Sequence, residues 1–166
     1  MIYIVVEGQT DKALVKNILS DKKEQQDYKF LGLKGDSSVF KVLKNLREND
    51  FSQNSYFAIV DADKSFTQRD IELAKLMKED NYYIFPNHKD NGDLETLLLS
   101  SISENKIIKC FDKYKKCVEK DIDNKAKFYA YTTLEHNKKP EEYIETLDTS
   151  VSDFTILKKK LQNLFK

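Results

Sequence analysis

The chain has 166 residues, of which 28 are basic and 28 acidic, so its formal charge is zero although 34% of its positions are charged. Apolar residues make up 40% of the sequence, and only four glycines and two prolines interrupt it, which excludes collagen-like and disordered proteins. The zero balance also excludes a nucleic-acid binder that acts by positive charge alone, because such a domain would be strongly basic. It leaves open an enzyme that acts on nucleic acid.

The basic residues are almost all lysine, with Arg47 and Arg69 as the only arginines. The two cysteines, Cys110 and Cys117, suit neither a disulfide framework nor the close pairs of a zinc site. The sequence has no apolar run of about 18 residues and no pattern of a secretory leader. We therefore expect a cytoplasmic protein that does not enter a membrane.

The first hundred residues alternate between short apolar runs and helical patterns, which is typical of a parallel sheet with crossover helices. Apolar runs predict four strands, at residues 2–6, 29–33, 56–60 and 82–85. Helices are predicted after Thr10, from Ser37 and after Thr67. Right-handed crossovers favour the strand order 2-1-3-4.

Beyond Asn87 the periodicity becomes helical, with apolar stripes at residues 94–102, 107–118, 141–147 and 154–165, and with a segment at 125–134 that favours helix over strand. We find no linker or internal repeat. The sequence thus predicts a single α/β domain, with a core at residues 1–103 and a helical C-terminal extension at 104–166 packed on it.

Acidic residues follow three of the predicted strands. Glu7 follows the first strand, Asp61 and Asp63 follow the third, and Asp93 and Glu95 come soon after the fourth. Ligands of open parallel sheets bind at the carboxyl ends of the strands, so these acids, with Asp11, are expected to lie close together. Carboxylates without histidine or cysteine partners select Mg²⁺ or Mn²⁺ over zinc.

Each acid also has a simpler interpretation. Asp11, Asp93 and Glu95 suit helix N-termini, where they cap the helix or balance its dipole. Asp61-Ala62-Asp63 is also compatible with a solvated turn. Glu7 is the hardest to explain in this way, because a charge directly after a buried strand usually belongs to a site.

The pattern of Val6-Glu7-Gly8 and Val60-Asp61-Ala62-Asp63 resembles the Toprim domain of topoisomerases, bacterial primases and nucleases of the overcoming-lysogenization-defect type. The resemblance covers residues 1 to about 100. Asp11 and Asp93-Leu94-Glu95 resemble the nuclease branch, in which such acids help to hold a second metal. The chain lacks the ATPase half of the large nucleases, since it has no glycine-rich phosphate loop. A separate protein partner could supply ATPase or targeting function.

The resemblance and the acids together predict Mg²⁺- or Mn²⁺-dependent phosphodiester chemistry on nucleic acid, DNA rather than RNA, by a two-metal nuclease mechanism. The expected metal ligands are Glu7, Asp11, Asp61, Asp63, Asp93 and Glu95, and the expected catalytic residues are Glu7, Asp61, Asp63 and Lys64. His88 is a weaker candidate for proton transfer. Lys89, Lys113, Lys115 and Lys116 are candidates for contacts with a phosphate backbone, although lysines on amphipathic helices are more often solvated.

Two other functions remain open. Asp61-x-Asp63-x-Ser65 fits the nucleophile motif of haloacid-dehalogenase-type phosphatases, but that interpretation expects the motif on the first strand and leaves Glu7 unexplained. The other alternative is a Toprim-like binding module without catalysis, as a regulatory subunit of a DNA repair or defence complex.

Overall fold

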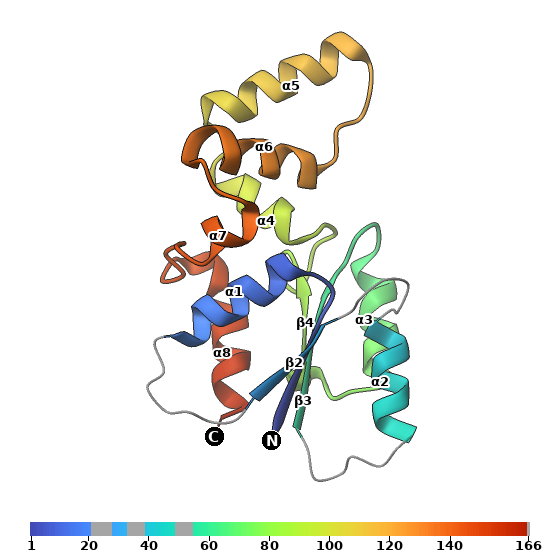
Figure 1. Cartoon of the computed structure of the whole chain (residues 1–166). Helices are drawn as coiled ribbons and strands as arrows, with labels where there is room; N and C mark the ends of the chain where they lie inside the picture. Colours follow the sequence, from blue (N-terminus) through green and yellow to red (C-terminus); the bar gives the residue numbers. More distant parts are fainter. Residues whose placement is uncertain (21–27, 33–38, 49–54, 166) are drawn as a thin grey trace.

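The computed structural model describes residues 1–20, 28–32, 39–48 and 55–165. Four strands form one all-parallel sheet in the order β2-β1-β3-β4, as the crossover argument predicts (Figure 1). Val6, at the end of β1, lies beside Gly32 of β2 and Ile59 of β3. The strands are β1 (Ile2–Val6), β2 (Tyr28–Gly32), β3 (Ser55–Asp61) and β4 (Tyr82–Phe85).

Helices cover both faces of the sheet, which explains why the strands are continuous apolar runs rather than alternating ones. On one face, α1 (Gln9–Ser20) and α8 (Thr155–Asn163) pack against alternate residues of the strands, such as Ile4 and Phe57 (Figure 1). The same core cluster includes Leu157 and Leu161 of α8, so residues from both ends of the chain share it.

The other face is covered by α2 (Val39–Glu48) and α3 (Phe66–Ala74). Val5, Ala58 and Ile84 point into this second cluster, because successive side chains of a strand alternate between the faces. A short 3-10 helix, η1 (Glu79–Asn81), leads from α3 into β4.

The remaining helices lie beyond the carboxyl ends of the strands, where α4 (Leu94–Ser101) and α6 (Asn124–His136) are neighbours and α5 (Lys106–Val118) is farthest from the sheet (Figure 1). A short helix, α7 (Pro140–Ile144), and η2 (Ser152–Phe154) lead back to α8. The Asn17 side chain donates hydrogen bonds to the Ile144 and Leu147 carbonyls, at 2.7 and 2.8 Å. These bonds connect α1 to the C-terminal end of α7 and the residues after it.

Several predicted boundaries differ from the observed ones. Ser65, rather than Thr67, is the N-cap of α3 and accepts a hydrogen bond from the Gln68 amide. Thr10 lies inside α1, and α7 ends at Ile144 instead of reaching residue 147. The segment at 125–134 is helical, within α6. Leu33 and Ser37, which the patterns place in a strand and at a helix start, lie outside the described residues. In the described ranges, no helix is both long and apolar enough to cross a membrane.

Candidate functional site

The carboxyl edge of the sheet is the part of the fold where ligands of parallel sheets bind. The chain runs from β1 to β2 on one side and later from β3 to β4 on the other, so the direction of winding changes between the neighbouring strands β1 and β3. The crevice beyond such a pair of strands is the usual ligand site. Glu7 follows β1 and Asp61 ends β3, which places both at this crevice.

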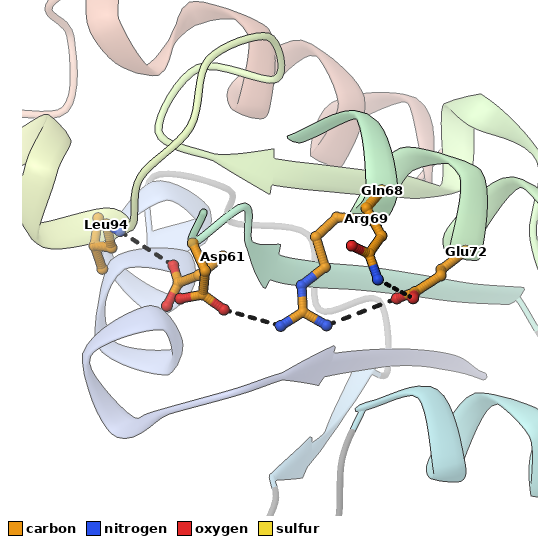
Figure 2. A network of polar contacts seen from close by, with 6 residues as sticks. Asp61, Gln68, Arg69, Glu72 and Leu94 are labelled. Atoms are coloured by element: carbon orange, nitrogen blue, oxygen red, sulfur yellow. Dashed lines mark hydrogen bonds and ion pairs between the residues drawn. The ribbon is translucent and has the colours of Figure 1, made fainter. Parts of the chain in front are cut away.

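Asp61 is buried at the end of β3, with 6% of its surface exposed. Its Oδ1 accepts a hydrogen bond of 3.1 Å from the Leu94 amide, the first residue of α4 (Figure 2). Burial raises the pKa of Asp61 from its ordinary 3.8 to about 8, and the negative charges of Asp11 and Glu7 raise it further in the same direction. Burial is thus the main cause of the raised pKa, and the neighbouring carboxylates add to it.

Asp11 and Glu7 form the β1 side of this edge. Asp11 is 4% exposed, and its Oδ2 accepts a hydrogen bond of 2.8 Å from the Gly8 amide, which fixes the turn between β1 and α1. Burial raises the pKa of Asp11. Glu7 is partly buried, and that burial raises its pKa to about 7, against the lowering effect of the Arg69 charge.

Asp93 and Glu95 both belong to the N-terminus of α4, with different surroundings. Asp93 is the N-cap, and its Oδ1 accepts hydrogen bonds from the Thr96 amide at 2.7 Å and the Thr96 hydroxyl at 2.5 Å. Glu95 is 5% exposed, and burial raises its pKa. Asp93 thus has the capping role that its position suggests, while Glu95 is an additional buried acid at the edge.

Asp63 is exposed, unlike Asp61 two residues before it. Its backbone has φ +51°, and its amide and carbonyl pair with those of Gly92 at 2.8 and 2.9 Å. Its Oδ2 lies 2.9 Å from the Nη2 of Arg69. The two acids of the Asp-x-Asp motif therefore have different partners: Asp61 contacts the start of α4, and Asp63 contacts α3.

Two cations that the sequence patterns do not single out face these acids. Arg69 comes from α3 and pairs with Asp63. Lys125, the second residue of α6, has an exposed side chain, and although partial desolvation lowers its pKa, the charges of Glu95 and Asp61 outweigh this and raise it. A hydrogen bond of 2.9 Å from the Asn124 side chain to the Thr96 hydroxyl ties the start of α6 to the start of α4. The C-terminal segment thus contributes a positive charge to the edge.

A groove of about 890 Å³ adjoins the acids, between α3 and the connection from α5 to α6. Its lining includes both acidic and basic side chains, among them Asp63, Lys64, Arg69, Asp93, Lys115 and Lys127. Of the other predicted lysines, Lys116 lines a separate depression on α5, and Lys89 and Lys113 are exposed and line neither hollow. Lys64 and Lys115 are therefore the predicted lysines that the fold brings to the groove.

His88 is part of the packing after β4 and is not in the lining of the groove. Its Nδ1 accepts a hydrogen bond of 3.2 Å from the Ile84 amide, and its ring stacks on Tyr83 with centroids 5.5 Å apart. Burial lowers its pKa. These contacts favour the interpretation of His88 as a structural residue.

The donor set at the edge consists of carboxylate oxygens, which are the ligands that Mg²⁺ and Mn²⁺ prefer. As the side chains lie, the described part of the chain contains no group of three or more acidic, histidine or cysteine residues positioned to hold one metal ion. The chemistry of the donors therefore fits a hard divalent cation, and binding would require side-chain rotation. Comparisons with protein-family models, curated proteins and solved structures give no match.

Proposed function

We propose that the protein catalyses Mg²⁺- or Mn²⁺-dependent hydrolysis of phosphodiester bonds in nucleic acid. The observation that carries this proposal is the burial of Asp11, Asp61 and Glu95 at the carboxyl edge of the sheet, next to Glu7. Three carboxylates buried within range of each other's charge are costly to a fold unless they serve a cation or a reaction.

Among the residues that the structure describes, the charges at the edge do not balance. Six carboxylates lie there, namely Glu7, Asp11, Asp61, Asp63, Asp93 and Glu95, against the cations Arg69 and Lys125. Burial raises the pKa of both Glu7 and Asp61, and the charge of Asp11 raises both further. Binding of divalent cations would lower these pKa values and leave the acids ionised as ligands.

The buried acids and Glu7 are the first candidates to hold the metal, with Asp63 and Asp93 as outer ligands. When bound, Mg²⁺ or Mn²⁺ would supply activation of water and stabilisation of the leaving oxygen. Where Glu7 does not bind the metal, its carboxylate would hold or release a proton as a general acid or base. Lys64, in the groove beside Asp63, is placed to neutralise phosphate charge.

The groove and the family resemblance support nucleic acid as the substrate. The groove begins at Asp63 and Asp93 and continues to Lys115 and Lys127 on the α5 and α6 wall, so a phosphate chain in it would reach these two acids. The resemblance to the Toprim nucleases favours DNA over RNA and allows for a protein partner that supplies ATPase or targeting function.

A second candidate function is a Toprim-like binding module without catalysis. It is favoured by two contacts: Asp63 is engaged by Arg69, and Asp93 is engaged as the cap of α4. Both acids thus have roles that need no metal. Such a module would bind metal or nucleic acid without turnover, as part of a repair or defence complex.

The test is an assay of the purified chain with Mg²⁺ or Mn²⁺ on plasmid DNA, single-stranded DNA and RNA, with a small phosphate monoester in parallel. The variants are Asp61→Ala and Glu7→Ala, with the exposed Glu135→Ala on α6 as a matched control. We expect cleavage by the wild type and the control, and none by the two site variants, whose circular dichroism should stay native.

Each alternative has its own signature in this assay. Equal cleavage by the wild type and Asp61→Ala would overturn the assignment of the site. Release of phosphate from the monoester with intact nucleic acid would indicate the haloacid-dehalogenase-type phosphatase. A metal-dependent rise in melting temperature, without turnover of any substrate, would indicate the binding module.

A further inference from the structure

Arg69 is one of only two arginines in the chain, and it lines the groove beside the acids. Its side chain is 29% exposed, and its guanidinium lies over the ring of Phe40, 5.3 Å from the centroid. The contact with an aromatic ring helps to hold the guanidinium in place, and its N–H groups remain for hydrogen bonds. Arg47, the other arginine, lies on α2 and donates to the Lys75 carbonyl at 2.8 Å, outside the lining of the groove.

The edge of the Arg69 guanidinium is held by carboxylates at two points. Nη2 contacts Asp63 at 2.9 Å, and Nη1 lies 3.8 Å from Glu72 (Figure 2). Glu72 is in turn held by the Gln68 side chain, which donates to it at 3.2 Å (Figure 2). Carboxylate and phosphate oxygens present the same geometry to a guanidinium, so this arrangement is also suited to a phosphate.

We infer that Arg69 binds a phosphodiester group of the nucleic acid. In the structure without substrate, the Asp63 carboxylate occupies the place on Arg69 that a phosphate oxygen would take. The inference rests on the proposed function, because it takes the groove as the substrate site. The Asp63 side chain is 55% exposed, so its ion pair with Arg69 is weak and can be exchanged. A divalent cation bound at Asp63 competes directly with Arg69 and frees its Nη2 for a phosphate oxygen.

The size of the groove suits one strand. Its volume of about 890 Å³ lies in the range of single-ligand sites, about 300–1,000 Å³, so a short single strand is the matching probe. Lys115 and Lys127 on the opposite wall are paired with Asp121 and Asp112, whereas Arg69 adjoins the catalytic edge. Arg69 and Lys64 are thus the lining cations on the side of Asp63, and of these two Arg69 has the guanidinium that can hold a phosphate at two points.

The experiment measures two affinities of the full chain. Fluorescence anisotropy of a short labelled single-stranded oligonucleotide, with Ca²⁺ present, compares the wild type with Arg69→Gln, Arg69→Lys and the control Arg47→Gln. We expect Arg69→Gln to weaken binding about tenfold, Arg69→Lys to recover only part of the loss because lysine lacks the bidentate fork, and Arg47→Gln to match the wild type. Equal effects of Arg69→Gln and Arg47→Gln, or no effect of either, would overturn the inference.

Mn²⁺ titration, read by electron paramagnetic resonance without nucleic acid, separates this inference from the proposed function. Arg69→Gln is expected to bind Mn²⁺ more tightly than the wild type, since the cation that competes for Asp63 is gone. Weaker Mn²⁺ binding by Arg69→Gln would contradict the inference that Arg69 and a divalent cation compete for the Asp63 carboxylate. A wild type that binds no Mn²⁺ would instead contradict the proposed function, whatever the oligonucleotide comparison gives.

Discussion

The carboxyl edge of the sheet and the α5–α6 hairpin (residues 106–136) are both rich in charge, but they differ in burial. At the edge, Asp11, Asp61 and Glu95 are almost fully buried and lie within range of each other's charge. On the hairpin, charges form pairs at the surface, such as Lys115 with Asp121, whose side chains are 44% and 86% exposed. Buried like charges cost stability, whereas exposed opposite charges contribute little. Burial, rather than the number of acids, therefore identifies the edge as a candidate site.

The largest expected effect concerns metal affinity. Asp11→Asn should weaken Mn²⁺ binding by at least about 10–100-fold, because it removes a buried carboxylate from the donor set while keeping its size. Asp112→Asn, on the hairpin, should leave the affinity unchanged. Electron paramagnetic resonance titration measures both, and equal affinities of the two variants would remove the distinction between the regions.

The next effect is a dependence of stability on pH in the metal-free protein. Asp61 and Glu7 have pKa values of about 8 and about 7 in the folded state, above their ordinary 3.8 and 4.5. Between these limits the folded state binds more protons than the unfolded state, so the free energy of unfolding falls as pH rises from about 4 to 8. Because one unit of pKa corresponds to about 1.4 kcal/mol, the wild type should lose several kcal/mol over this range.

Denaturant unfolding of Asp61→Asn tests the source of this slope. The amide cannot ionise, so the variant should be more stable than the wild type at pH 8 and should show a flatter dependence. Asp112→Asn should keep the slope of the wild type. A variant Asp61→Asn with an unchanged slope would mean that Asp61 does not titrate as its burial implies.

A smaller effect is expected at Gly92, whose backbone holds the Asp63 loop. Gly92 has φ +133°, and a Cβ there would lie 2.9 Å from the Thr96 hydroxyl oxygen. Gly92→Ala should therefore lower the free energy of unfolding by about 2 kcal/mol. Gly8→Ala is the control, since its Cβ would meet its neighbours at 3.5 Å, an ordinary contact. Thermal or denaturant unfolding compares the two, and equal losses would contradict the role of the Gly92 backbone.

The smallest effect is expected for a surface pair. Lys109 contacts Glu104 at 2.6 Å, but their side chains are 52% and 89% exposed. Lys109→Ala should change the free energy of unfolding by less than about 0.5 kcal/mol, because solvent screens such pairs. A loss above 1 kcal/mol in denaturant unfolding would show that the hairpin charges matter more than their exposure suggests.

The sheet could be predicted from the sequence because its signals are local. Apolar runs give the strands, and the handedness of crossovers gives their order. Helix starts were less accurate: Ser65 and Thr67 are both good caps, and only the path of the chain decides between them. The closeness of Glu7 and Asp61 followed from the order of the strands.

The cations of the edge could not be predicted in the same way. Arg69 had one signal, its rarity among the basic residues, but its pairing with Asp63 depends on how the chain turns between them. Lys125 had no signal, since it is one of many lysines and reaches the edge through the packing of α6 on α4. Such contacts between distant segments depend on tertiary packing, which sequence periodicity does not encode.

The position of α8 in the fold has a consequence for biosynthesis. Every acid of the edge, and Lys125 as well, precedes α8 in the chain, yet Leu157 and Leu161 of α8 complete one face of the core. During synthesis from the N-terminus, the strands and their charged edge leave the ribosome while α8 does not yet cover its part of that face, beside α1. The nascent chain therefore carries its acids on a half-covered sheet until α8 is made and docks.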